Sequence, residues 1–334
     1  MASKYFFSLK SIKPQTSNEA GSLTFVTSKE APGFVNISFA NLNLNKRGST
    51  EPVWHPNANK IGYCVEGNVL VSIRTPDKVE NFTVKKGEIF FIPQGYVHHI
   101  ENIDETRSVI NFALNNSNPE TMYLSKAVYS ISESVFNSTF NTSSRFIDGL
   151  EKSKNNELIK TLPKLTYVPS AIDSQYKFAI EDSGQALSTK GGYLQIGTKP
   201  SFPVLQGLGI LGFGLNPKGC VEPHWHTNAG ELVYIVKGTT RITVLSPDGQ
   251  VDVLEVKAGE GAFAPASYFH NIENVGLDDV EVIAFFSHDS PDYIGIGEVV
   301  GSYSNEVLAS VFNTTPNYFD SFEKPTGPLV IVPI

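Results

Sequence analysis

Residues 222–234 read Glu222-Pro-His-Trp-His-Thr-Asn-Ala-Gly-Glu-Leu-Val-Tyr234, and an earlier stretch of the chain follows the same pattern. That earlier stretch reads Glu51-Pro-Val-Trp-His-Pro-Asn-Ala-Asn-Lys-Ile-Gly-Tyr63 and lies 171 residues before it. The flanking glycines keep the same offset, Gly48 with Gly219 and Gly67 with Gly238. An offset shared by the motif and its flanks indicates an internal duplication of the chain.

The duplication continues downstream of these stretches. Residues 87–102 share Gly, Glu, Pro, His and Asn with residues 259–274, now at an offset of 172. The one extra residue falls where Ser246-Pro-Asp-Gly249 stands in place of Thr75-Pro-Asp77. Because a hairpin tip tolerates an insertion better than a strand does, we expect each of these turns to join two strands.

The chain between the motifs has the composition of β-strands. Runs rich in β-branched and aromatic residues alternate with turn residues at intervals of about 8–12 positions, as in antiparallel sandwiches and barrels. The clearest runs are residues 69–73, 88–93, 109–114, 241–245 and 280–286. We therefore predict an all-β chain of two tandem jelly-roll β-barrels, with short helices after each barrel.

A length of 334 residues suits two domains of about 150 residues each. Ser134-Val-Phe-Asn137 matches Ser310-Val-Phe-Asn313, which places a short helix after each barrel, and Ser304 is a candidate N-cap of the second. The polar residues 143–156 are typical of a linker. We predict an N-terminal domain over residues 1–150 and a C-terminal domain over residues 151–334.

Charge and composition exclude several classes of protein. A net charge of −8 and an isoelectric point near 5.4 argue against a nucleic-acid partner. No run of about 18 apolar residues occurs, so we expect no membrane-spanning segment. The first residues have no apolar core typical of a secretory signal, and only two cysteines are present. We therefore expect a cytoplasmic, reducing location and no disulfide framework.

Three histidines and a glutamate in the second copy have the spacing of metal ligands. His224 and His226 are two positions apart, so on a strand both imidazoles face the same side. Three imidazoles and one carboxylate suit manganese, iron, cobalt, nickel or zinc better than calcium or magnesium. We predict one divalent transition metal per chain, with two open coordination positions for a substrate. Its predicted ligands are His224, His226, Glu231 and His270.

These motifs resemble those of the cupin superfamily, whose first motif reads G-x5-H-x-H-x3–4-E-x6-G. The second half of the chain gives Gly219-x4-His224-Trp-His226-x4-Glu231-x6-Gly238. The second cupin motif reads G-x5-P-x-G-x2-H-x3-N, and the chain gives Gly259-x5-Pro265-x-Ser267-x2-His270-x3-Asn274. The resemblance covers both halves and implies a bicupin, that is, two cupin barrels in one chain.

The first copy lacks two of the four ligands. Val53 stands at the position of the first histidine and Lys60 at that of the glutamate, while His55 and His98 remain. Two imidazoles beside an ammonium would repel a divalent ion, so we expect no tightly bound metal in this barrel. One interpretation is a barrel kept as a scaffold and for subunit contacts. The other is an anion pocket in which His55, Lys60 and His98 face a carboxylate or phosphate.

Among bicupins, the second half is most similar to oxalate decarboxylases, and it also resembles germin-like proteins and seed storage globulins. The resemblance rests on residues 222–229 and on Ser290-Pro-Asp-Tyr-Ile-Gly-Ile-Gly297. It implies a manganese ion, an oxalate-like substrate, and a homo-oligomer that is a trimer or a hexamer.

The chain departs from oxalate decarboxylases at charged positions that family members use. They have an arginine three residues before the first histidine ligand, where this chain has Val221, and a glutamate 14 residues after the last, where it has Ala284. The nearest match to their lid segment is Ser117-Asn-Pro-Glu-Thr121, in the barrel without the ligand set. The aromatic residues expected to line a more apolar pocket, for a larger or less charged substrate, are Tyr234, Phe263, Phe269 and Phe285.

These motifs are compatible with three functions, of which two are enzymatic and one is not. The first is a metal-dependent enzyme acting on a small organic acid or polyol, with manganese as the expected metal. The second is a dioxygenase that uses iron or nickel. The third is a non-catalytic ligand-binding or storage bicupin. The retention of all four ligands counts against pure storage but not against metal-dependent ligand binding.

Overall fold

The computed structural model describes residues 3–142 and 158–334. The chain divides into two compact units, each built around one copy of the duplication. We call the unit of Lys13–Phe25 and Ser38–Phe178 the first barrel, and the unit of Met1–Ile12, Val26–Ile37 and Ala179–Ile334 the second barrel. The predicted domain boundary after residue 150 and the predicted linker at 143–156 lie in the part that the structure does not describe. Both stay predictions.

The first barrel consists of two antiparallel sheets, as expected for a jelly roll. The strands of one sheet are, in order, β15 (Lys177–Phe178), β10 (Ile89–Ile92), β7 (Lys60–Glu66), β12 (Ser108–Leu114), β4 (Ser38–Leu44), β3 (Gly21–Val26) and β2 (Thr16–Asn18). The other sheet runs β13 (Met122–Tyr123), β6 (Val53–Trp54), β11 (Val97–Asn102), β5 (Gly48–Thr50) and β14 (Ile159–Thr161). Strand β8 (Asn68–Arg74) joins this second sheet by pairing with β11 and with β9 (Val79–Lys85).

The second barrel repeats this arrangement. The strands of one sheet are β1 (Phe6–Ser8), β23 (Glu260–Ala264), β20 (Glu231–Lys237), β25 (Val280–Phe286), β18 (Gly209–Leu215), β17 (Gly192–Gly197) and β16 (Leu187–Thr189). The other runs β22 (Val251–Lys257), β21 (Thr239–Leu245), β24 (Phe269–Asn274), β19 (Gly219–Trp225) and β26 (Ile294–Gly295), and β27 (Ile331–Pro333) pairs with β19. Strand β1 comes from the N-terminal part of the chain, and no sequence motif predicts its pairing with β23.

The five strand-like runs and the two turns of the sequence analysis are confirmed. The runs fall on β8, β10, β12, β21 and β25. Strands β8 and β9 form one hairpin and β21 and β22 the other, so the extra residue of the second copy lies at a hairpin tip. Apolar side chains of both sheets fill each barrel, with Phe82, Phe90 and Phe112 fully buried in the first.

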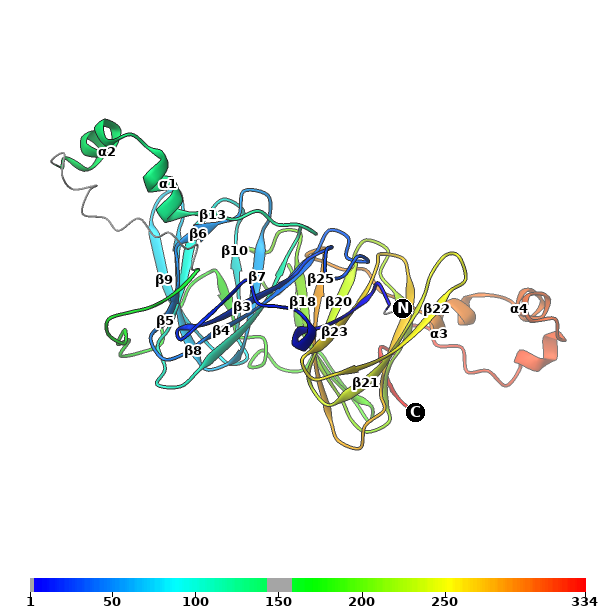
Figure 1. The fold of residues 1–334 in the computed structure, drawn as a ribbon. Coiled ribbons are helices and arrows are strands. Elements are labelled where there is room, and N and C mark those ends of the chain that lie inside the picture. The colour runs from blue at the N-terminus through cyan, green and yellow to red at the C-terminus, as the bar shows by residue number, and fades with distance from the viewer. Residues whose placement is uncertain (1–2, 143–157) are drawn as a thin grey trace. The chain divides into compact units, whose positions relative to one another are not determined.

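A pair of short helices follows each barrel, as predicted (Figure 1). These are α1 (Leu124–Ser130) and α2 (Glu133–Phe140) in the first barrel, and α3 (Ile296–Ser302) and α4 (Asn305–Phe312) in the second. Ser304 caps α4 by accepting a hydrogen bond from the backbone N–H of Val307, which confirms the predicted N-cap. Short 3-10 helices lie at Leu9–Ser11 and Pro316–Phe319.

None of the helices in the described parts of the chain is both long enough and apolar enough to cross a membrane. Cys64 and Cys220 are both buried free thiols, one in each barrel.

Candidate metal centre

The four predicted ligands come from both sheets of the second barrel and meet in its interior. His224 on β19 lies directly opposite His270 on β24. His226 follows the last residue of β19, and Glu231 is the first residue of β20 on the facing sheet. None of the four is more than 4% exposed. The structure thus brings together the whole predicted set.

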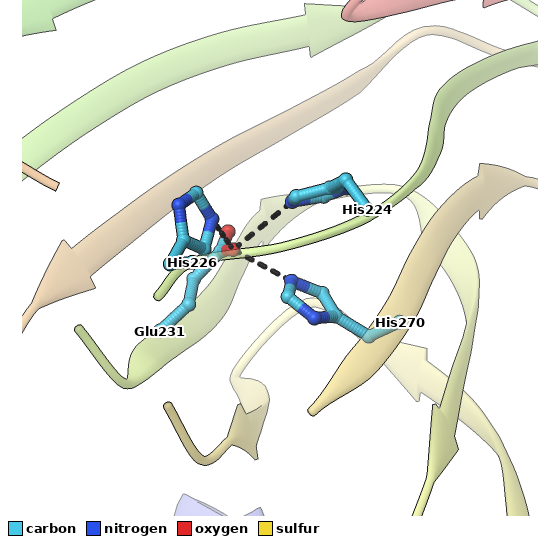
Figure 2. A group of neighbouring side chains, drawn as sticks. All are labelled: His224, His226, Glu231 and His270. Atoms are coloured by element: carbon cyan, nitrogen blue, oxygen red, sulfur yellow. Dashed lines mark hydrogen bonds and ion pairs between the residues drawn. The ribbon is translucent and has the colours of Figure 1, made fainter. Parts of the chain in front are cut away.

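The four side chains converge on one point (Figure 2). The Nε2 atoms of His270, His226 and His224 lie 2.8, 3.0 and 3.5 Å from the same carboxylate oxygen, Oε2 of Glu231. One ligand atom from each residue can be chosen so that all four lie within 4.8 Å of one another. Within the described residues this is the one such cluster of three or more histidine, cysteine or acidic side chains.

The orientation of each histidine fixes which ring nitrogen faces the site. Nδ1 of His224, His226 and His270 each bonds to a backbone carbonyl oxygen. The oxygens belong to Glu222, Asp292 and Tyr268, respectively. A carbonyl can only accept, so Nδ1 carries the ring proton and Nε2 of the neutral ring is left with a lone pair. With the ring proton on Nδ1, three Nε2 lone pairs face the Glu231 carboxylate, an arrangement that a cation between them would satisfy. A histidine whose other ring nitrogen bonds to a backbone carbonyl is typical of metal-binding histidines.

The protonation states suit the same role. Burial lowers the pKa of His224 to about 4, and the neighbouring His270 ring acts in the same direction. Burial raises the pKa of the Glu231 carboxyl, whereas the facing imidazoles, when they are protonated at Nε2, lower it well below its usual range, and a bound cation would act in the same direction in place of those protons. Near neutral pH the site therefore presents a neutral imidazole and an ionised carboxylate, the forms that bind metal ions.

Glu222 and Tyr293 support the ligands from behind, a role that the sequence analysis missed. The Tyr293 ring stacks on His224, with the ring centroids 4.6 Å apart. Its hydroxyl donates to Oε1 of Glu222 at 3.3 Å, and the backbone N–H groups of Leu329 and Val330 donate to the same oxygen at 2.8 and 3.0 Å. Both residues lie in the stretches that carried the oxalate decarboxylase resemblance, which was the signal available.

A cavity of about 250 Å³ adjoins the ligands, and three of them form part of its wall. The prediction that Tyr234, Phe263, Phe269 and Phe285 line it is wrong, because none of the four is among the described residues that do. Phe286 lines it instead. Phe285 and Phe286 are adjacent on β25, and adjacent residues of a strand face opposite sides. The prediction therefore chose the phenylalanine on the face opposite to the cavity. The expectation of an apolar pocket holds with different residues.

The first barrel has the same four positions as the metal centre, but two of them hold residues that are not metal ligands. Val53 on β6 lies opposite His98 on β11, and Lys60 begins β7, in the same registers as their counterparts in the second barrel. Nζ of Lys60 lies 3.3 Å from Nε2 of His98 and 4.2 Å from the centre of the Phe112 ring. The amine therefore faces the histidine lone pair that a metal ion would otherwise bind.

The space beside Lys60 is small, about 30 Å³, which is room for about one water molecule. Nδ1 of His55 bonds to the backbone oxygen of Glu120 and Nδ1 of His98 to that of Tyr96, so both Nε2 atoms offer lone pairs. Burial lowers the pKa of His55 to about 3, which keeps the ring neutral. Of the three residues of the predicted anion pocket, only Lys60 can donate a hydrogen bond to an anion. The predicted anion pocket stays a prediction. With Lys60 as the donor among its three residues, its volume limits the anion to about the size of a water molecule.

Replacing Lys60 with methionine should change how stability depends on pH. Burial lowers the pKa of Lys60 from 10.5 to about 7, so between these values the unfolded chain binds more protons than the folded one. The free energy of unfolding of the unaltered protein should therefore rise relative to Lys60→Met by up to about 1.4 kcal/mol per pH unit from pH 7 toward 10.5. Denaturant unfolding at pH 7 and pH 9 measures this, with the exposed Lys86→Met as control. Equal pH slopes for Lys60→Met and the unaltered protein would contradict it.

The family assignment follows from the sequence model of the cupin family, described as Cupin, which matches residues 7–148 and again residues 178–318. The chain therefore belongs to the cupin family and is a bicupin.

Its similarity to known proteins points to oxalate decarboxylase. Oxalate decarboxylase OxdC of Bacillus subtilis (strain 168) is 23% identical over 315 residues, covering 91% of this chain and 81% of that protein. A structure of oxalate decarboxylase from Bacillus subtilis at pH 4.6 matches with a TM-score of 0.86 at 20% identity, covering 100% of this chain and 88% of that one. Putative germin-like protein 2-3 of Oryza sativa subsp. japonica is 29% identical over 160 residues, 45% of this chain and 72% of that protein. The chain is thus an oxalate-decarboxylase-like bicupin.

Proposed function

We propose that this bicupin is a metal-dependent enzyme that acts on a small organic acid at one divalent metal ion in the second barrel. The observation that carries the proposal is the convergence of three histidine lone pairs and an ionised carboxylate beside a cavity. Manganese is the proposed metal, because one of the similar solved structures is described as that of oxalate decarboxylase with Mn(II) centres.

Four residues would bind the metal ion, and two others would hold these ligands in place. His224, His226, Glu231 and His270 would hold the ion, which when bound supplies a Lewis acid with open coordination positions. Tyr293 and Glu222 hold the His224 ring and the C-terminal segment in place. The burial of all the ligands keeps bulk water away from the charged centre, which strengthens electrostatic interactions there.

One metal ion per chain is part of the proposal. Lys60 takes the place of the glutamate ligand in the first barrel, and its amine already contacts His98. A divalent ion in that barrel would meet the Lys60 amine, whether charged or neutral, and no carboxylate at any of the four positions that correspond to the ligands of the second barrel. The first barrel would then serve as a scaffold.

The proposal predicts metal-dependent turnover. The full chain is stripped with a chelator, reloaded with manganese, iron or nickel, and supplied with oxalate, longer organic acids, sugars and aromatic diols. Consumption of an organic acid by the manganese-loaded protein and its loss after stripping are the expected results. Turnover that survives complete metal removal would contradict the proposal. Activity with iron or nickel alone, together with oxygen uptake, would favour a dioxygenase, and metal-dependent binding without turnover would favour a ligand-binding protein.

The helix pairs support a homo-oligomer as part of the proposal. In the second barrel, Val311 and Phe312 of α4 are 69% and 62% exposed, and in the first, Val135 and Phe140 of α2 are 53% and 57% exposed. Apolar side chains exposed on short helices are typical of surfaces that another chain covers. A trimer or hexamer would bury them.

The two buried free thiols fit a reducing compartment such as the cytoplasm.

A further inference from the structure

The wall of the cavity in the second barrel is apolar almost throughout. Six aliphatic side chains from β17, β18, β19 and the C-terminal segment line it, namely Leu194, Ile196, Leu211, Val221, Val330 and Ile331. Phe213 and Phe286 add aromatic surface. Among the described residues of the lining, none is a lysine or an arginine. A second anionic group on a ligand, away from the metal, would therefore be desolvated without a cation to pair with.

The polar groups of the lining do little to change this. Apart from the metal ligands, the polar side chains are Thr198 and Tyr293, and the Tyr293 hydroxyl already donates to Glu222. The cavity of about 250 Å³ has room for about eight water-sized groups at about 30 Å³ each. A ligand as small as oxalate would leave most of this apolar space without contacts, whereas an apolar body would fill it and gain burial energy.

We propose that the metal centre takes a small molecule with two adjacent oxygen atoms at one end, which chelate the metal, and an uncharged aliphatic or aromatic body at the other. A 2-oxo acid with an apolar side chain has this form, and a small dicarboxylate does not. The inference rests on the proposed function and specifies the class of organic acid. The lining residues, Val221 and Ile196 among them, determine this specificity.

A homologous series tests the inference by binding rather than by turnover. Pyruvate, 2-oxopentanoate and oxalate are titrated calorimetrically into the manganese-loaded full chain and into the stripped chain. Each buried methylene should tighten binding about fourfold, so 2-oxopentanoate should bind about tenfold or more tightly than pyruvate. Oxalate should bind more weakly than 2-oxopentanoate, and stripping should abolish the binding of all three. Equal affinities across the 2-oxo acids, tighter binding of oxalate, or equal binding to the stripped chain would overturn the inference.

A variant of one lining residue gives a second, independent readout. Val221→Arg places a cation in the wall and should raise the affinity for oxalate about tenfold or more while weakening that for 2-oxopentanoate. Val221→Leu, which keeps the wall apolar, is the matched control and should still bind 2-oxopentanoate more tightly than oxalate. If Val221→Arg does not fold, the series on the unaltered chain decides alone. A chain that binds no metal in the same preparation would overturn the proposed function, and the inference with it.

Discussion

Introducing a histidine at Val53 and a glutamate at Lys60 should give the first barrel a metal site of its own. The double variant Val53→His/Lys60→Glu should bind about two metal equivalents per chain, where the unaltered chain binds about one. Positions 53, 60 and 98 have the same strand partners in the first barrel as positions 224, 231 and 270 have in the second. The introduced side chains should therefore lie where the ligands lie in the second barrel. Since His55 and His98 are already present and buried, the two substitutions complete the four-ligand set.

The single variants are the controls for this gain. Val53→His alone keeps the Lys60 amine in the frame and should bind no second ion. Lys60→Glu alone restores the carboxylate but leaves three ligands, so its second site should be much weaker than that of the double variant. Element analysis after dialysis measures all of them. A folded double variant that still holds one equivalent would show that Lys60 is not what excludes a metal from the first barrel.

Glu231→Gln should abolish tight metal binding in the second barrel. Glutamine keeps the shape of the side chain but removes the one negative charge among the four ligands. Removing one partner of a buried charge pair costs about 3–5 kcal/mol, so the dissociation constant should rise by about two to four orders of magnitude. Calorimetric titration of the metal-free protein with manganese measures the change in the dissociation constant.

Glu260→Gln is the matched control for Glu231→Gln. Glu260 lies in the same barrel, and its carboxylate accepts a hydrogen bond from the backbone N–H of Lys257 rather than contributing to the ligand cluster. Its substitution should leave the metal affinity unchanged. Equal affinities of Glu231→Gln and Glu260→Gln for manganese would mean that the metal is held elsewhere.

The ligand set could be predicted from the sequence because its information is local and repeated. His224 and His226 are two positions apart, which predicts that they face the same side, and the duplication shows which positions Glu231 and His270 take in the ligand set. The same comparison identified Val53 and Lys60 as substitutions in the first barrel. The structure adds that Lys60 contacts His98, which follows from the side chain's reach and is not visible in the spacing.

The wall of the cavity could not be predicted in the same way. Leu194 and Ile196 lie on β17, and Val330 lies in the C-terminal segment, both far in sequence from the ligand motifs. Their proximity to the metal site depends on long-range strand pairing, for which no motif gives the partner. The same holds for β1, whose pairing with β23 brings the N-terminus of the chain into the second barrel. Phe286 was missed by one residue, because neither the composition nor the motifs fix which face of a fully apolar strand points inward.

The measurement that tests the central claim most directly is the metal content of the unaltered full chain, purified without a histidine tag and dialysed after loading with manganese. We predict about one equivalent per chain, held by His224, His226, Glu231 and His270 and absent from Glu231→Gln. Two equivalents in the unaltered chain, or one equivalent that persists in Glu231→Gln, would contradict the assignment of a single metal site to the second barrel.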